Sequence, residues 1–251
     1  MNIVITDDYS SLSTYVAKQI VTTIKNNKHT VLGLPTGGTP EGMYKELVKM
    51  YNHGEVDFSS VKTFNLDEYI GLSKEHSQSY YYYMKRNLFN HVNLKRENVH
   101  VPYSNTKNMQ VTCEEYEREI DYAGGIDLMI LGIGLNGHIG FNEPGSSATD
   151  TTRIVDLDES TIVANSRYFS SLKDVPKKGI TIGIKTILKS KKIILIASGL
   201  NKSQIISEVL ENEPTSKIPA TYLKLHPNVQ LVLDKDASSN LDPSLFCTTN
   251  T

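Results

Sequence analysis

The chain has 251 residues, with 26 Lys and Arg against 28 Asp and Glu, and a net charge of −2 at pH 7. This balance argues against a nucleic-acid partner, which usually requires a basic excess. The longest apolar runs are far shorter than the ~20 residues that cross a bilayer. Two cysteines, Cys113 and Cys247, can build neither a disulfide framework nor a four-cysteine zinc site. Since the N-terminus also has no basic leader or long apolar segment, we predict a soluble, cytoplasmic protein without a membrane partner.

Short apolar runs alternate along the chain with longer amphipathic stretches. This alternation is typical of an α/β fold with an open, mostly parallel, Rossmann-like sheet and helices on both faces. The spacing of apolar residues predicts a helix over Ser11–Lys25 and a second one around Tyr44–Tyr51. The predicted strands are Asn2–Thr6, Thr30–Leu34, Val61–Asn65, Val99–Pro102, Asp127–Gly132, Lys192–Ala197 and Val229–Leu233. No linker or repeat divides the chain, so we expect one domain over residues 1–251, with a polar tail from about residue 238.

The loop after the second strand reads Thr36-Gly37-Gly38-Thr39-Pro40. Thr39 is suited to cap a helix and Pro40 to its first position, so a helix is expected to begin here. Glycines at a helix start allow backbone N–H groups to approach and bind a phosphate. The same residues also fit a plain tight turn before a capped helix. The Gly-Lys-Ser/Thr ending of a nucleotide-binding P-loop is absent.

Two adjacent carboxylates, Asp67 and Glu68, follow the third strand. Because successive side chains of a strand point to opposite faces, we do not expect both in one site. An isolated Asp-Glu pair is more often an ordinary turn or cap. The tyrosines at positions 80–83 that follow fit core packing on a helix better than a stacking surface for bases.

A glycine-rich loop after the fifth strand contains Asn136, His138 and Glu143. A lone histidine is usually structural, but a nearby carboxylate would orient the imidazole and raise its basicity for acid–base work. His138 and Glu143 supply two of the three protein ligands usual for catalytic zinc, so a metal site is not expected. The glycines from 132 to 137 have the spacing of a dinucleotide-binding turn, but the helix that should follow is missing.

Two cations complete the set of candidate residues. Lys202 stands near a predicted helix start after the sixth strand, where a positive charge opposes the helix dipole unless an anion is bound. An ordinary solvated surface is the default interpretation for Lys202, and equally for Arg167.

Together these loops resemble the glucosamine-6-phosphate deaminase family over nearly the whole chain. The resemblance rests on Leu34–Pro40, Phe64–Leu72 and Gly137–Pro144, with support from Val163–Arg167 and Leu225–Pro227. It implies an aldose–ketose isomerase-deaminase that acts in amino-sugar catabolism, in the use of N-acetylglucosamine, without a metal or organic cofactor. The implied reaction converts D-glucosamine 6-phosphate and water into D-fructose 6-phosphate and ammonium.

The resemblance also implies roles for single residues. His138 would open the sugar ring with help from Glu143 and Asn136, and Asp67 would move a proton from C2 to C1. The implied phosphate-binding residues are Thr36, Gly37, Gly38, Thr39, Arg167 and Lys202.

The sequence departs from the family pattern at two places. Asn136 stands where many members carry Asp, so this position can orient His138 but cannot stabilise imidazolium by charge. Arg153 matches an arginine of the effector site in allosteric hexameric members, but their lysine two positions on is Val155 here, followed by Asp156. The longer C-terminal extension of those members is also absent. We therefore expect no activation by N-acetylglucosamine 6-phosphate, and a monomer or small homo-oligomer.

Two other functions share a similar fold. A 6-phosphogluconolactonase also has a Gly-His motif, but it would lack the Leu66–Tyr69 stretch and would follow its histidine with a pattern other than Phe141–Pro144. The sugar-phosphate domain of a transcriptional regulator would need an N-terminal helix-turn-helix, for which the chain leaves no room. It would also not need the complete set of catalytic groups.

Overall fold

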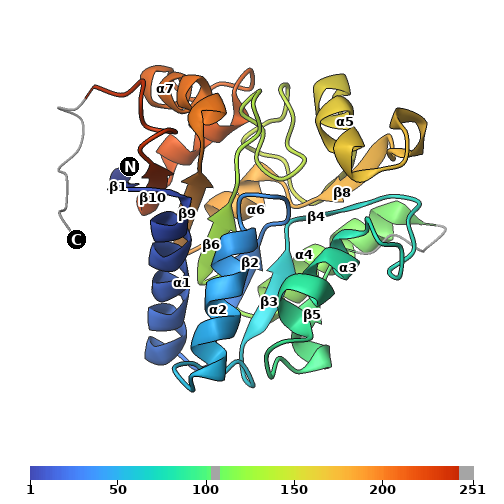
Figure 1. Cartoon of the computed structure of the whole chain (residues 1–251). Coiled ribbons are helices and arrows are strands. Elements are labelled where there is room, and N and C mark those ends of the chain that lie inside the picture. The colour runs from blue at the N-terminus through green and yellow to red at the C-terminus, as the bar shows by residue number, and fades with distance from the viewer. Residues whose placement is uncertain (103–107, 243–251) are drawn as a thin grey trace.

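Seven strands form the central sheet of the protein, in the order β1-β10-β9-β6-β2-β3-β5, and every neighbouring pair is parallel (Figure 1). The computed structural model describes residues 1–102 and 108–242. Each predicted strand agrees with an observed one to within two residues at either end, so the mostly parallel α/β fold is confirmed. The strands are β1 (Asn2–Thr6), β2 (Val31–Leu34), β3 (Lys62–Asn65), β5 (Val99–His100), β6 (Leu128–Leu131), β9 (Lys192–Ala197) and β10 (Val229–Asp234).

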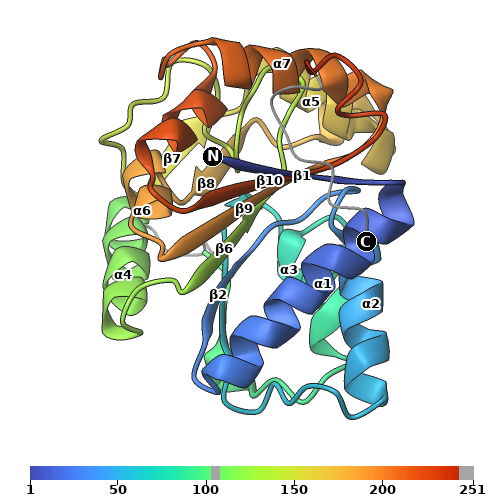
Figure 2. The same cartoon turned by 90° about the vertical axis from the view of Figure 1, so that its left-hand side faces the viewer.

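Helices pack on both faces of this sheet (Figures 1 and 2). One face is covered by α1 (Tyr9–Asn26), α2 (Glu41–Asn52) and α3 (Tyr80–Met84), which continues as a π-helical turn. The other face is covered by α4 (Met109–Tyr122), α6 (Ile184–Leu188) and α7 (Ser203–Glu211). Alternate residues of one strand enter the two cores, so Ile194 packs towards α1 and α2 while Ile193 packs on the opposite side. This two-sided burial is the reason why β6 and residues 193–197 of β9 are continuously apolar.

The start of α2 differs from the prediction. The helix begins at Glu41, and Pro40 occupies the capping position with φ −78° and ψ −5°. Thr39 is therefore not the helix cap, and no side chain caps this end. The proline ring already holds a helical φ, so the helix can begin without a side-chain cap.

A second, antiparallel sheet was not predicted from the sequence. It consists of β4 (Asp67–Tyr69), β8 (Lys178–Thr181) and β7 (Arg153–Asp156), in that order. Its strands have only three or four residues, too few to show a clear hydrophobic period, and they pair across long sequence separations. The chain between β7 and β8 includes α5 (Glu159–Asn165), which lies above the carboxyl ends of the parallel strands in Figure 1.

The order of the central sheet reverses between β2 and β6. From β2 the chain adds β3 and β5 on one side, and then β6, β9 and β10 on the other. In open parallel sheets such a reversal opens a crevice beyond the carboxyl ends of the strands, where ligands bind. The loops that follow β2 and β6 meet at this crevice.

The C-terminal part of the chain is ordered further than expected. Ser238 is buried, and Leu241 packs into the core on the side of α7. The rest of the predicted polar tail, including Cys247, lies outside the described residues. Among the helices of the described residues, none is long and apolar enough to span a membrane.

Candidate active site

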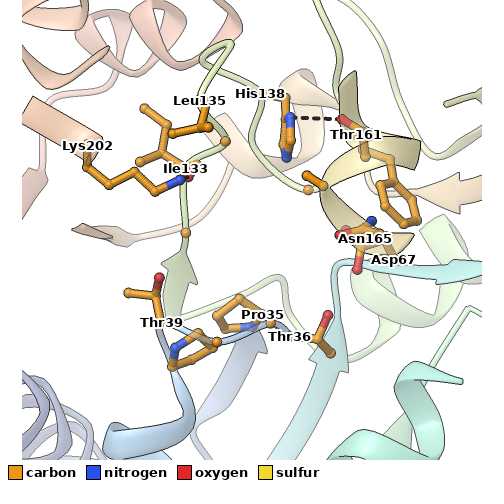
Figure 3. A pocket seen from close by; sticks show the side chains of 18 of the residues that line it. Pro35, Thr36, Thr39, Asp67, Ile133, Leu135, His138, Thr161, Asn165 and Lys202 are labelled. Atoms are coloured by element: carbon orange, nitrogen blue, oxygen red, sulfur yellow. Dashed lines mark hydrogen bonds between the residues drawn. The ribbon is translucent and has the colours of Figure 1, made fainter. Parts of the chain in front are cut away.

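A cavity of about 490 Å³ lies at the switch between β2 and β6 (Figure 3). The loop after β2 and the loop after β6 line it from two sides, and Asp67 lines it from β4. Further wall comes from α5 with the residues after it and from the loop after β9. Nine of the ten predicted site residues line this cavity, and Glu143 contacts one of them, His138. The fold therefore brings the whole predicted set together.

The loop after β2 presents unpaired N–H groups to the cavity region. Gly37 has φ +100°, a conformation that favours glycine. The carbonyl oxygens of Gly37 and Gly38 accept hydrogen bonds from the hydroxyls of Tyr83 (2.7 Å) and Tyr9 (3.2 Å), which brace the loop. Within residues 1–102 and 108–242, no acceptor takes the backbone N–H groups of Gly37, Gly38 or Thr39. Such a row of donors at a helix start is suited to an anion.

Two cations face the same region. Lys202 ends a short 3₁₀ turn before α7, and its Nζ donates to the carbonyl oxygen of Ile133 at 2.7 Å. Burial, together with the charge of Arg167, lowers the pKa of Lys202 to about 8. Two neighbouring cations that are partly removed from water favour an anion between them, and an anion would raise the pKa of Lys202 again.

Asn136 links the two ionisable groups of the loop after β6. Its Oδ1 lies 2.7 Å from Nδ1 of His138, and its Nδ2 donates to Oε2 of Glu143 at 2.9 Å. Nδ1 of His138 also lies 3.3 Å from Oε2 of Glu143. Since the neighbours of Nδ1 are acceptor oxygens, we assign the ring proton of His138 to Nδ1. Nε2 is then left to accept a proton on the side of the cavity (Figure 3). Burial raises the pKa of Glu143, but the hydrogen bond and charge of His138, together with hydrogen bonds from Thr161 and Asn136, outweigh it, so the pKa is lowered overall.

The sequence analysis missed two neighbours of His138. Gly134 must be glycine, because a Cβ atom there would overlap the imidazole ring. Its place in a Gly-x-Gly pattern was visible, but the reason for it was not. Thr161 of α5 is buried, and its hydroxyl lies 3.4 Å from Nδ1 (Figure 3). No sequence signal marks Thr161, because it reaches the histidine from a segment more than twenty residues away.

Asp67 and Glu68 take opposite sides of β4, as the alternation of strand side chains predicts. Asp67 lines the cavity, and only 6% of its surface is exposed. Burial, with the charge of Glu68, raises the pKa of Asp67 to about 8. A carboxyl group with this pKa can both take and return a proton near neutral pH.

A metal site is not apparent. In the part of the chain that the structure describes, no three His, Cys, Asp or Glu side chains are grouped so that they could hold a metal ion.

Residues 7–232 match the family described as glucosamine-6-phosphate isomerases/6-phosphogluconolactonase. The chain belongs to this family. It is 54% identical over 239 residues to a glucosamine-6-phosphate deaminase of Thermoanaerobacter pseudethanolicus, covering 95% of this chain and 94% of the relative. It is 52% identical over 241 residues to a glucosamine-6-phosphate deaminase of Clostridium botulinum, covering 96% and 99%.

A solved structure supports the same assignment. A monomeric glucosamine-6-phosphate deaminase superposes with a TM-score of 0.94 at 42% identity, over 96% of this chain and all of that one. A 6-phosphogluconolactonase from Thermotoga maritima superposes with a TM-score of 0.74 at 21% identity, over 93% and 98% of the two chains. The second likeness shows a common fold alone.

Proposed function

We propose that this enzyme converts D-glucosamine 6-phosphate and water into D-fructose 6-phosphate and ammonium. The proposal is supported by relatives named for this deaminase at more than 50% identity over nearly the whole chain. The observation that carries it is a single cavity in which Asp67, the His138–Glu143 pair and the loop after β2 meet. This arrangement offers one proton carrier for the ring, another for the sugar carbons and a set of donors for a phosphate.

Binding begins at the phosphate. The free N–H groups of Gly37, Gly38 and Thr39 donate to its oxygens, and Arg167 and Lys202 supply the counter-charge. Anchored at the end remote from the reacting carbons, the sugar extends towards His138 and Asp67. Holding it in this geometry lowers the entropic cost of the chemical steps.

Ring opening requires a proton to move from the C1 hydroxyl to the ring oxygen. Nε2 of His138 takes the first proton and returns it to the ring oxygen, which yields the open-chain aldehyde. Oxygens of Asn136 and Glu143 accept from the Nδ1–H group of His138. The ring therefore keeps its orientation while the charge on the imidazole changes.

Isomerisation moves a proton from C2 to C1. Asp67 removes the C2 proton while O1 gains a proton from water, which gives an enolamine. Asp67 then protonates C1, and the nitrogen releases a proton to water, which leaves an imine at C2. Water adds to this imine, and the resulting carbinolamine breaks its C–N bond to release ammonia, which leaves as ammonium, and fructose 6-phosphate. Asp67 meets the requirement for one carboxyl group that reaches both carbons and exchanges protons near neutrality.

The direct test is incubation of the purified chain with glucosamine 6-phosphate while ammonium and fructose 6-phosphate are measured separately. We expect both products in equal amounts. Formation of neither would refute the proposal. Hydrolysis of 6-phosphogluconolactone, measured in parallel, would instead assign the cavity to the other activity in the family's name.

Asn136 provides a sharper prediction about ring opening. Changing Asn136→Asp places a second carboxylate beside Nδ1 of His138, where it stabilises the imidazolium form. We expect the variant to remain active and the limb of its pH–rate profile that reports His138 to move to higher pH. An unchanged profile of kcat/KM against pH would contradict a role of residue 136 in ring opening.

The environment of Arg153 predicts the absence of allosteric activation. Its guanidinium donates to Oδ1 of Asn142 (2.8 Å) and Oγ of Ser146 (2.9 Å), and it lies 3.1 Å from a carboxylate oxygen of Asp150. An effector phosphate would have to displace this carboxylate without help from a cation at Val155. We expect hyperbolic rate curves that N-acetylglucosamine 6-phosphate leaves unchanged. Sigmoidal curves that the effector alters would contradict this.

A further inference from the structure

Glu68 is a buried carboxyl group that the proposed mechanism does not use. It follows Asp67 directly in β4, but its side chain points away from the cavity, and only 1% of its surface is exposed. A charged group is costly to bury unless it is paired or hydrogen-bonded, so its presence in the core calls for a physical reason.

Three backbone N–H groups surround this carboxyl group. Oε1 accepts from the N–H groups of Tyr69 (2.8 Å) and Tyr80 (2.9 Å), and Oε2 accepts from that of Tyr81 (2.9 Å). Tyr80 and Tyr81 are the first residues of α3. Because both oxygens face donors, the ionised form fits this site, whereas a protonated form would direct its O–H at an N–H. Burial raises the pKa of Glu68 overall, although the three hydrogen bonds and the charge of Lys74 oppose the rise.

The surroundings of Asp67 leave Glu68 as its main charged neighbour. Tyr44, Tyr80 and Tyr116, from α2, α3 and α4, interact electrostatically with Asp67. Burial raises their pKa values well above normal, so they are neutral near pH 7. Tyr69 of the same strand is also neutral, while Lys74 contributes a positive charge on the Glu68 side. Among the described residues, no hydrogen bond to the Asp67 carboxyl group contributes to its pKa, which burial and the charge of Glu68 raise.

We propose that Glu68 is a positioning residue for Asp67: its carboxylate, anchored by three backbone N–H groups directly after Asp67 in β4, supplies the fixed negative charge against which Asp67 exchanges its proton. This inference rests on the proposed function, because the basicity of Asp67 matters only if Asp67 carries the C2 proton. The anchoring also joins β4 to the start of α3, so the strand that bears Asp67 is held in place. The two effects are separable, because one depends on charge and the other on hydrogen bonds.

The test compares Glu68→Gln with Glu68→Asp. The Gln variant keeps the size of the side chain and removes its charge, whereas the Asp variant keeps the charge and loses hydrogen bonds through its shorter arm. We expect Glu68→Gln to shift the acidic limb of kcat/KM to lower pH by about one unit, the scale at which close ionisable groups interact. In Glu68→Asp the acidic limb of kcat/KM should lie at the same pH as in the wild type, although the unfolding temperature of this variant falls.

Glu117→Gln is the matched control. The Glu117 carboxylate also accepts three hydrogen bonds, from the N–H (2.7 Å) and Oγ1 (2.6 Å) of Thr152 and from Oγ1 of Thr186 (2.6 Å), but it does not line the cavity. This control should lose stability without any change in the pH profile.

Three results would overturn the inference. They are an unmoved limb in Glu68→Gln, equal shifts in both Glu68 variants, and a shift in the Glu117 control of the same size. If Glu68→Gln does not fold, Glu68→Asp decides the matter, because a moved limb in that variant would show that charge is not the controlling property. A wild-type chain that releases no ammonium would refute the proposed function instead, so the two failures are distinguishable.

Discussion

Replacing Asp67 by Asn is expected to reduce kcat by about 10²–10⁴-fold, the usual contribution of a positioned acid or base. The amide has nearly the same size as the carboxyl group but cannot take the C2 proton. Ring opening at His138 does not need this group, so the variant should still bind the substrate. The measurement is kcat from ammonium release, with Asp121→Asn, a surface carboxylate of α4, as the control that retains activity. Full turnover by Asp67→Asn would remove Asp67 from the mechanism.

The same substitution should stabilise the fold at alkaline pH. The pKa of Asp67 is about 8 in the folded chain, against about 3.9 when unfolded. Between these values the folded state holds a proton that the unfolded state has released, so stability falls as pH rises. An amide at this position does not ionise and escapes this loss. We expect denaturant unfolding to show the variant more stable than the wild type by up to about 5 kcal/mol at pH 8, with the difference vanishing near pH 4. A difference independent of pH would contradict the raised pKa.

Gly134→Ala is expected to lower kcat about 10²-fold, an effect of the size that a displaced catalytic group produces. Gly134 has no positive φ, so its backbone accepts alanine without strain. The added methyl group, however, would overlap the imidazole of His138. The ring must turn or shift, which breaks its short contact with Oδ1 of Asn136. The loss should therefore appear in kcat and in the NMR signals of the His138 ring more than in the stability of the fold.

Gly132→Ala is the matched control for this variant. It adds the same methyl group two residues earlier in the loop, where a Cβ atom would meet nothing within 4 Å. We expect a much smaller loss of kcat and an unperturbed His138 signal. Equal losses in both variants would mean that the methyl group disturbs the loop or crowds the cavity, which both glycines line, and does not act through the imidazole.

Local sequence patterns are sufficient to predict the central sheet and several of the residues that line the cavity. The apolar runs of β6 and β9 are buried on both faces, so each is recognisable without its neighbours. The separation of Asp67 from Glu68 follows from strand geometry alone. The sequence pattern predicts the start of α2 one residue too early, because Thr39 satisfies the rule for a helix cap but lines the cavity instead.

The antiparallel sheet could not be foreseen in the same way. Its short strands are stable only because residues such as Asp67 and Thr181, far apart in sequence, pair in the folded chain. The contacts of Thr161 and Asn165 depend on this sheet, since it carries α5 over the cavity. Asn165 donates to the hydroxyl of Tyr69 at 2.8 Å, a contact between two segments with no common sequence signal.

Residue types and their order along the chain predict the class of fold, the family and nine of the residues that line the cavity. How those residues are tuned depends on the packing of the folded chain. Burial beside Glu68 raises the pKa of Asp67, burial and a neighbouring cation lower the pKa of Lys202, and the missing side chain at Gly134 leaves room for an imidazole. Each of these effects depends on distance and on the exclusion of water, which arise only when distant segments pack together.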